Sequence, residues 1–126
     1  MENHPDRRDS RRIIVGPEFT IRFVVKGHVF QGIRITNLSV GGCFAVVGSG
    51  DAKLFGQGTV MENLAFENPQ MHAEGITGEV RYVLGGSASG TGFDFVGLGV
   101  RFVSIPESVS TVLQAFVARS ANLPGA

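Results

Sequence analysis

The sequence predicts an all-β fold: a six-stranded antiparallel, split β-barrel with a C-terminal α-helix packed on it and a flexible N-terminal tail. Eighteen glycines, about twice the usual share, interrupt short apolar runs, which favours many turns and short strands. Within several of these runs, apolar residues alternate with polar ones, the period of a half-buried strand. Ten Phe with one Tyr and no Trp indicate a barrel interior filled by phenyl rings.

The strands follow one another in the first half of the chain with short connections. The first predicted strand covers 19–25, and a tight turn at Gly27-His28 leads to a return strand at 29–36. Gly32 inside that return strand predicts a bulge or a close approach of backbone. A glycine-bounded turn at 37–42 precedes a strand at 43–47.

The second half is expected to complete the barrel. A polar, glycine-rich connection at 48–58 leads to strands at 59–67 and 72–84, which flank the Asn68-Pro69 turn. A glycine-rich hairpin tip at 85–90 precedes the closing strand at 93–103. Short antiparallel connections between all six predict closure, because a closed barrel leaves no sticky edge.

One helix is predicted after the barrel. Ser104 and Glu107 have the spacing of a capping box, and Pro106 falls in the first turn, where a missing N–H does no harm. An apolar stripe with helical spacing then predicts a face packed on the barrel. It consists of Val109, Val112, Leu113, Phe116 and Val117.

The length of the chain limits its domain organisation, and its charge limits the kinds of partner that it can bind. The 126 residues predict one domain, with a flexible Arg-rich tail at 1–12, the barrel and helix at 13–120, and a C-terminal tail at 121–126. The formal net charge is zero, which weighs against a general nucleic-acid binder. Positive charge is local instead, since the first twelve residues hold four Arg, a pattern that suits a small polyanion.

Several classes of protein are not expected. The polar N-terminus lacks a signal peptide and no apolar run could span a bilayer, so we expect a cytoplasmic protein without membrane insertion. Cys43 sits in an apolar run and is interpreted as a buried core residue. The three His are widely separated without metal-ligand spacing, and no nucleophile elbow or phosphate-binding loop occurs. We therefore expect a binding module and not an enzyme, with no metal and no cofactor.

Two short segments carry the candidate chemistry. The first is the arginine cluster Arg7-Arg8-Asp9-Ser10-Arg11-Arg12, and the second is Asn37-Leu38-Ser39-Val40-Gly41-Gly42. Guanidinium forks suit phosphate oxygens and the O6/N7 edge of guanine, and they stack on purines. Amide, hydroxyl and free backbone N–H groups can complete such a site from a turn. Each segment alone is more often a solvated tail or an ordinary turn, but together they indicate ligand binding.

These segments resemble the signature of the PilZ domain, the bacterial receptor module for cyclic di-GMP. That signature is Arg-x-x-x-Arg followed, after a strand or two, by (Asp/Asn)-x-Ser-x-x-Gly; here Arg8 to Arg12 and Asn37 to Gly42 supply the two parts. The frame Arg7 to Arg11 also fits, but the run from Arg12 into an apolar segment favours the former. Asn37 replaces the commoner Asp, which the pattern allows. The resemblance continues through 79–81, 98–103 and the helix.

The resemblance implies a cyclic di-GMP receptor that works as an adaptor, ordering its N-terminal tail on binding and signalling through an effector protein. The implied ligand contacts are Arg7, Arg8, Arg12, Asn37, Ser39, Gly41 and Gly42. In the family, an Arg at the position of Arg7 goes with two intercalated ligand molecules per chain. Arg81 and Arg101 lie in predicted strands and are interpreted as surface charge or as members of a local ion pair, with contact to a bound ligand as the alternative. The alternative is a nucleotide-independent interaction module of pilus or flagellar machinery.

Overall fold

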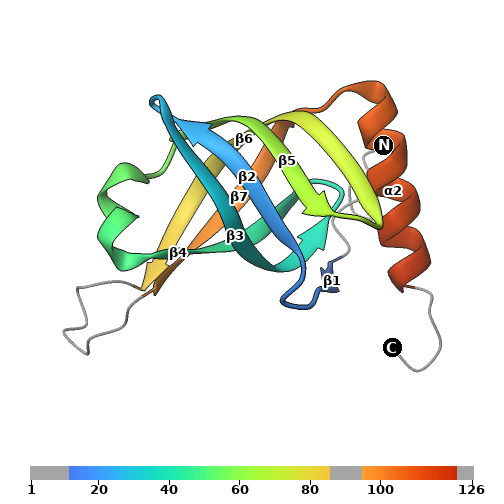
Figure 1. Cartoon of the computed structure of the whole chain (residues 1–126), viewed down its shortest axis with the longest axis horizontal. Coiled ribbons are helices and arrows are strands. Elements are labelled where there is room, and N and C mark those ends of the chain that lie inside the picture. Colours follow the sequence, from blue (N-terminus) through green and yellow to red (C-terminus); the bar gives the residue numbers. More distant parts are fainter. Residues whose placement is uncertain (1–11, 86–94, 122–126) are drawn as a thin grey trace, which may run out of the picture.

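The computed structural model describes residues 12–85 and 95–121, which form a barrel with one flanking α-helix (Figure 1). A short 3-10 helix, η1 (Ser49–Leu54), lies at the end of the barrel opposite to the α-helix, α2 (Glu107–Ala121). The strands are β1 (Ile13–Ile14), β2 (Thr20–Val25), β3 (His28–Ser39), β4 (Gly42–Gly48), β5 (Val60–Asn68), β6 (Met71–Gly85) and β7 (Phe95–Ser104).

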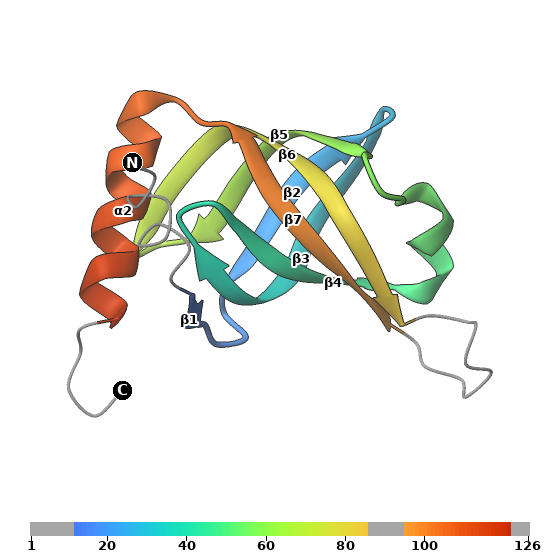
Figure 2. The same ribbon diagram turned by 180° about the vertical axis from the view of Figure 1, so that it is seen from behind.

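The predicted six-stranded antiparallel barrel is confirmed. The strand order is β1-β3-β2-β5-β6-β7-β4, and β3 also pairs with β4, so the sheet closes on itself. Figure 2 shows this closure from behind, where β4 and β7 run between β3 and β6. The extra strand β1 was not predicted. It contains only two residues and pairs with β3, Ile13 opposite Leu38 and Ile14 opposite Asn37.

Phenyl rings fill much of the barrel interior, as the composition predicts. Phe23 stacks on Phe30 with ring centroids 5.2 Å apart, and Phe55 lies against both. At the other end, Phe19 contacts Phe66 and the helix residue Phe116. These ring pairs add specific geometry to the burial of apolar area that drives the fold.

The helix packs on the barrel through four of its five predicted stripe residues. Leu113, Phe116 and Val117 are buried in the common core, and Val109 packs against it. Val112, in contrast, is 41% exposed, so its assignment to the buried stripe is wrong. The reason is geometric, because helical spacing predicts a wide stripe and the contact with the barrel covers only part of it.

The turn predicted at 37–42 exists, but it is shorter than predicted. Residues 37–39 belong to β3, only Val40 and Gly41 form the turn, and β4 begins at Gly42. Leu38 pairs with Ile13 on one side and with Cys43 on the other. Strand pairing on both sides therefore overrides the turn preference of Asn and Ser.

Two further turn predictions can be compared with the structure. The first hairpin turns at Lys26 and Gly27, one residue earlier than predicted, and both residues have positive φ. The bulge predicted at Gly32 is confirmed, because Gly32 has a φ of 64° and the register of β2 against β3 shifts opposite it. The Glu67 carboxylate accepts the Gly32 N–H at 3.0 Å and thereby fixes the bulge. Most of the predicted tip at 85–90 lies outside the described residues.

Candidate functional site

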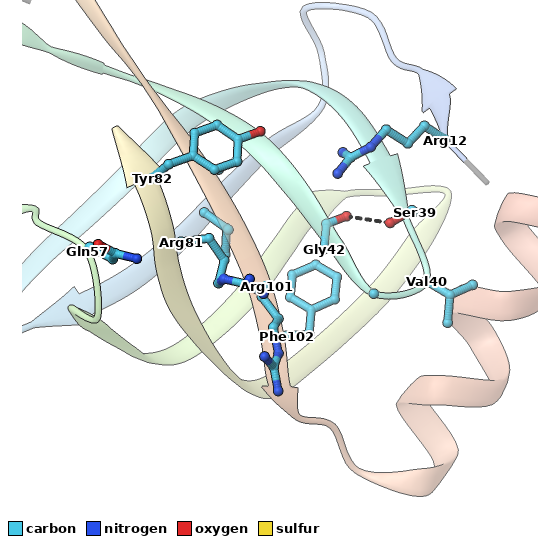
Figure 3. A pocket seen from close by; sticks show the side chains of 12 residues that line it. Arg12, Ser39, Val40, Gly42, Gln57, Arg81, Tyr82, Arg101 and Phe102 are labelled. Atoms are coloured by element: carbon cyan, nitrogen blue, oxygen red, sulfur yellow. Dashed lines mark hydrogen bonds between the residues drawn. The ribbon is translucent and has the colours of Figure 1, made fainter. Parts of the chain in front are cut away.

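A groove of about 750 Å³ crosses the outer face of the barrel. Figure 3 shows Arg12 at one end and Gln57 at the other, with Tyr82, Arg81 and Arg101 between them. The groove has a motif half, formed by the β3–β4 turn and Arg12, and a strand half, formed by β6, β7 and Gln57. Its lining residues are Arg12, Ser39, Val40, Gly41, Gly42, Gln57, Arg81, Tyr82, Gly99, Val100, Arg101 and Phe102.

Strand register brings the two sequence segments together in the motif half. Ile13 and Ile14 pair antiparallel with Leu38 and Asn37, so continuing this register by one residue sets Arg12 opposite Ser39. The Arg12 guanidinium donates a hydrogen bond from Nη1 to Asn37 Oδ1 at 2.6 Å. This contact joins residues 25 apart in the sequence and holds the guanidinium beside the turn.

Ser39 is the last residue of β3 and borders the turn. It is 3% exposed, and its hydroxyl donates to the Gly42 carbonyl at 3.3 Å, as the dashed line in Figure 3 marks. Ser39 also lines the groove, and its hydroxyl oxygen keeps lone pairs that can accept a hydrogen bond. Ser39 therefore serves the geometry of the turn first and offers an acceptor to the groove second.

The two glycines after Val40 differ in the space that a side chain would find at each position. A Cβ at Gly42 would lie 2.0 Å from the Val100 carbonyl oxygen, because β7 passes directly over this position. A Cβ at Gly41 would meet nothing within 4 Å, and the Gly41 backbone is not in the left-handed region. The barrel thus requires glycine at 42, whereas glycine at 41 leaves open space beside the groove.

Tyr82 and Arg81 reach the groove because β6 carries a bulge. Val80 pairs with Val100 and Tyr82 pairs with Gly99, so Arg81 is an extra residue in the register. Val80 points into the core, while Arg81 and Tyr82 are both exposed. A bulge re-aims side chains in this way. The Tyr82 ring lies against Gly99, where a Cβ would come within 2.3 Å of it.

The groove is a site of concentrated positive charge. Three guanidiniums line it, those of Arg12, Arg81 and Arg101, and no carboxylate is among its described lining residues. Glu79 lies opposite Arg101 across the β6–β7 pair, but the ion pair found among residues 12–85 and 95–121 is elsewhere, between Arg22 and Glu74. Such a groove attracts an anion, and Tyr82 offers it an aromatic face.

The structure describes most, but not all, of the predicted contact residues. Arg7 and Arg8 lie outside the described residues. Arg12, Ser39, Gly41 and Gly42 all line the groove, and Asn37 reaches it through its contact with Arg12.

Arg81 and Arg101 both line the groove, a position that fits the alternative of ligand contact better than the preferred interpretation as surface charge. The sequence pattern gives no indication of the groove residues Tyr82 and Gln57. The bulge that exposes Arg81 and Tyr82 has no glycine or proline to mark it in the sequence.

Buried Cys43 lies under the motif half and is confirmed as a core residue, 1% exposed. Burial raises the pKa of its thiol from 9.0 to about 12, and the Arg12 charge opposes this only in part. Within the described part of the chain, no three side chains of His, Cys, Asp or Glu gather closely enough to hold a metal ion. Nor is any helix there long and apolar enough to cross a bilayer.

Comparison with known proteins gives a family match. The model of the PilZ domain family matches residues 6–119 of this chain. No curated protein matches the sequence.

Solved structures with the same fold include apo MrkH of K. pneumonia, at a TM-score of 0.73 and 14% identity, covering 96% of this chain and 50% of that one. The PilZ domain of YcgR from Escherichia coli, solved with c-di-GMP, gives a TM-score of 0.67 at 14% identity and covers 88% of each chain. The Bacillus subtilis inhibitor of motility (MotI/DgrA) gives 0.67 at 17%, with coverages of 90% and 51%. This chain thus spans about half the length of MrkH and of the inhibitor of motility.

Proposed function

Because this chain belongs to the PilZ domain family, we propose that it is a receptor for cyclic di-GMP, which binds in the groove. The observation that carries the proposal is the hydrogen bond from Arg12 to Asn37, which unites the two halves of the signature at one end of a cationic groove. The structure of the YcgR PilZ domain with c-di-GMP supports the choice of ligand.

Each proposed contact has a chemical role. Arg8 and Arg12 present guanidinium forks to the phosphates or to the Hoogsteen edge of guanine. Since Asn37 Oδ1 accepts from Arg12, its amide NH₂ is left to donate to a ligand oxygen. Ser39 and Gly41 form the wall beside the open space at position 41, while Gly42 acts by keeping β4 and β7 close together.

The signalling output is proposed to depend on the N-terminal tail. Ordering a tail costs about 1–2 kcal/mol of backbone entropy per residue, which several charge-assisted contacts can offset. A ligand that holds Arg8 and Arg12 would create a surface present only in the bound state, and an effector protein in the cytoplasm would recognise it. Arg7 adds a third guanidinium of the tail cluster, and we propose that it supports a second, intercalated ligand molecule.

Titration calorimetry with cyclic di-GMP tests the proposal. We expect binding by the parent protein with about two ligands per chain, and we expect Arg7→Ala to reduce this number toward one. Arg8→Ala and Arg12→Ala should each weaken binding by at least about 2 kcal/mol, since each removes a charged donor from an anionic ligand. Arg34→Ala is the matched control, because Arg34 is an exposed barrel arginine outside the groove.

The result that would contradict the receptor function is an absence of binding heat at high ligand concentration with correctly folded protein. A nucleotide-independent interaction module would then be the better reading. Binding with one ligand per chain would contradict only the role of Arg7. Equal weakening by Arg12→Ala and Arg34→Ala would indicate diffuse electrostatic attraction and not a defined contact.

A further inference from the structure

The strand half of the groove lies outside both parts of the signature, and its side chains suit a ligand. Arg81 and Arg101 come from adjacent strands and line the same surface as Arg12 (Figure 3). The bulge in β6 exposes Arg81 and Tyr82 together, although alternation would otherwise turn one of them inward.

An aromatic surface adjoins these two arginines. Tyr82 is 45% exposed and lies flat against Gly99, and Phe44 lies against Gly97 in the same way. The two ring centroids are 6.4 Å apart with an interplanar angle of 37°. Because both glycines lack a side chain, the rings rest on the sheet and turn a face outward. Such rings are stacking surfaces for bases, which all have a π-face.

The distance across the groove suits a ligand with two nucleotide units. β6 and β4 are separated by β7 alone, so the motif half and Arg81 lie two strand spacings apart, roughly 10 Å. A single phosphate cannot span from the β3–β4 turn to Arg81, whereas a dinucleotide can. With no carboxylate among the described lining residues, a second phosphate would meet positive charge and no negative charge.

We infer that Arg81, Arg101 and Tyr82 form a second anchoring half of the groove, in which the two arginines bind a phosphate and the Tyr82 ring stacks on a purine. The inference rests on the proposed function, because it assigns the other end of the same ligand. The inference goes beyond the proposed function because it places ligand contacts on β6 and β7, which contain no residue of the signature. Tyr82 is in this view a contact that favours a nucleotide over a simple polyanion.

The protein carries its own reporter for this contact. Tyr82 is the single Tyr of a chain without Trp, so the intrinsic tyrosine emission comes from the groove alone. We expect cyclic di-GMP to quench this emission in the parent protein, with a midpoint equal to that of calorimetry. Inorganic pyrophosphate, an anion without a base, should leave the emission unchanged.

Variants test the arginines. Arg81→Gln and Arg101→Gln should each lower the affinity for cyclic di-GMP about tenfold, the loss of one charge-assisted contact at an exposed site. Each should also make the affinity less sensitive to salt. Arg34→Gln is the control, with unchanged affinity. Tyr82→Leu should weaken binding several-fold, and Tyr82→Phe should restore most of it, because the ring and not the hydroxyl is required. Circular dichroism melts establish that each variant is folded.

The outcomes separate the two proposals. If the parent binds cyclic di-GMP while its emission stays constant and the Arg81→Gln and Arg101→Gln affinities equal that of the parent, the second anchoring half is overturned and the receptor function stands. If the parent does not bind at all, both fail. Quenching by pyrophosphate equal to that by cyclic di-GMP would overturn the stacking on Tyr82.

Discussion

The two adjacent glycines at the β3–β4 turn allow the fold and the ligand site to be perturbed separately. We expect Gly42→Ala to destabilise the free protein and Gly41→Ala to leave its stability unchanged. A Cβ at position 42 would lie 2.0 Å from the Val100 carbonyl oxygen, whereas one at position 41 would have no neighbour within 4 Å. The two substitutions add the same methyl group one residue apart, so each is a control for the other.

The magnitude follows from the contact. A carbon and a carbonyl oxygen normally approach no closer than about 3.3 Å, so β4 and β7 would have to separate by roughly an ångström. The obstacle is backbone on both sides and cannot rotate away. Forced overpacking typically costs about 1–3 kcal/mol, and each ladder hydrogen bond lost near Gly42 and Arg101 adds about 0.5–1.5 kcal/mol. We expect a total of about 2–4 kcal/mol.

Thermal unfolding measured by circular dichroism provides the assay. For a domain of this size, about 2–4 kcal/mol corresponds to a fall in Tm of roughly 8–16 °C, while Gly41→Ala should stay within about 2 °C of the parent. Titration with cyclic di-GMP should show the converse, with Gly41→Ala weaker than the parent because the methyl group fills space beside the groove. A parental Tm for Gly42→Ala, or a large fall for Gly41→Ala, would refute this reasoning.

Three further predictions concern the core. Leu113→Ala should lower the free energy of unfolding by about 2–5 kcal/mol, because Leu113 is the fully buried residue on the inner face of α2. Val112→Ala, on the exposed face of α2, should change this free energy by less than about 0.5 kcal/mol. Equal effects of the two substitutions in urea titrations would contradict the packing of α2. Cys43 should not react with a thiol reagent at pH 8 until the protein unfolds, since burial raises the pKa of its thiol to about 12. The same shift predicts stability that is fully present below pH 9 and decreases as the pH rises from 9 toward 12, because only the unfolded thiol ionises in that range, and pH-dependent urea titrations of the parent and Cys43→Ala measure it.

The sequence predicts the barrel well because the barrel depends on a property that repeats. Alternating apolar residues mark β2, and nearly every long strand contains a run of this kind. Errors at single positions therefore do not alter the number of predicted strands. Gly32 could be assigned to a bulge because its special backbone conformation favours the one residue type that adopts it easily. Cys43 could be assigned to the core from the apolar residues that follow it.

The features that the sequence does not predict depend on pairing between segments distant in the chain. β1 has two residues and no period, and it exists because Ile13 lies against Leu38 in the core. The residues from Asn37 to Ser39 prefer turns, yet strands on both sides hold them extended. Arg81 and Tyr82 became visible as groove residues only through a shift in the β6–β7 register. Local preference is weak in each case, and tertiary contacts decide.

The register of β1 against β3 also explains how two segments 25 residues apart act at one place. Antiparallel pairing of Ile14 with Asn37 and of Ile13 with Leu38 fixes Arg12 opposite Ser39, whatever the length of the hairpin-forming chain between them. The spacing inside each segment must therefore be kept, since it sets which side chains face the groove, whereas the spacing between the segments can vary with the strands that intervene. A ligand held by Arg12 would rest on β1, whose only described anchor in the core is Ile13, 8% exposed. So short a strand gains little stability by itself, and ligand contacts at Arg12 would add directly to it. β1 would thus be the element whose stability a ligand at Arg12 changes, while the six strands of the closed barrel would not change.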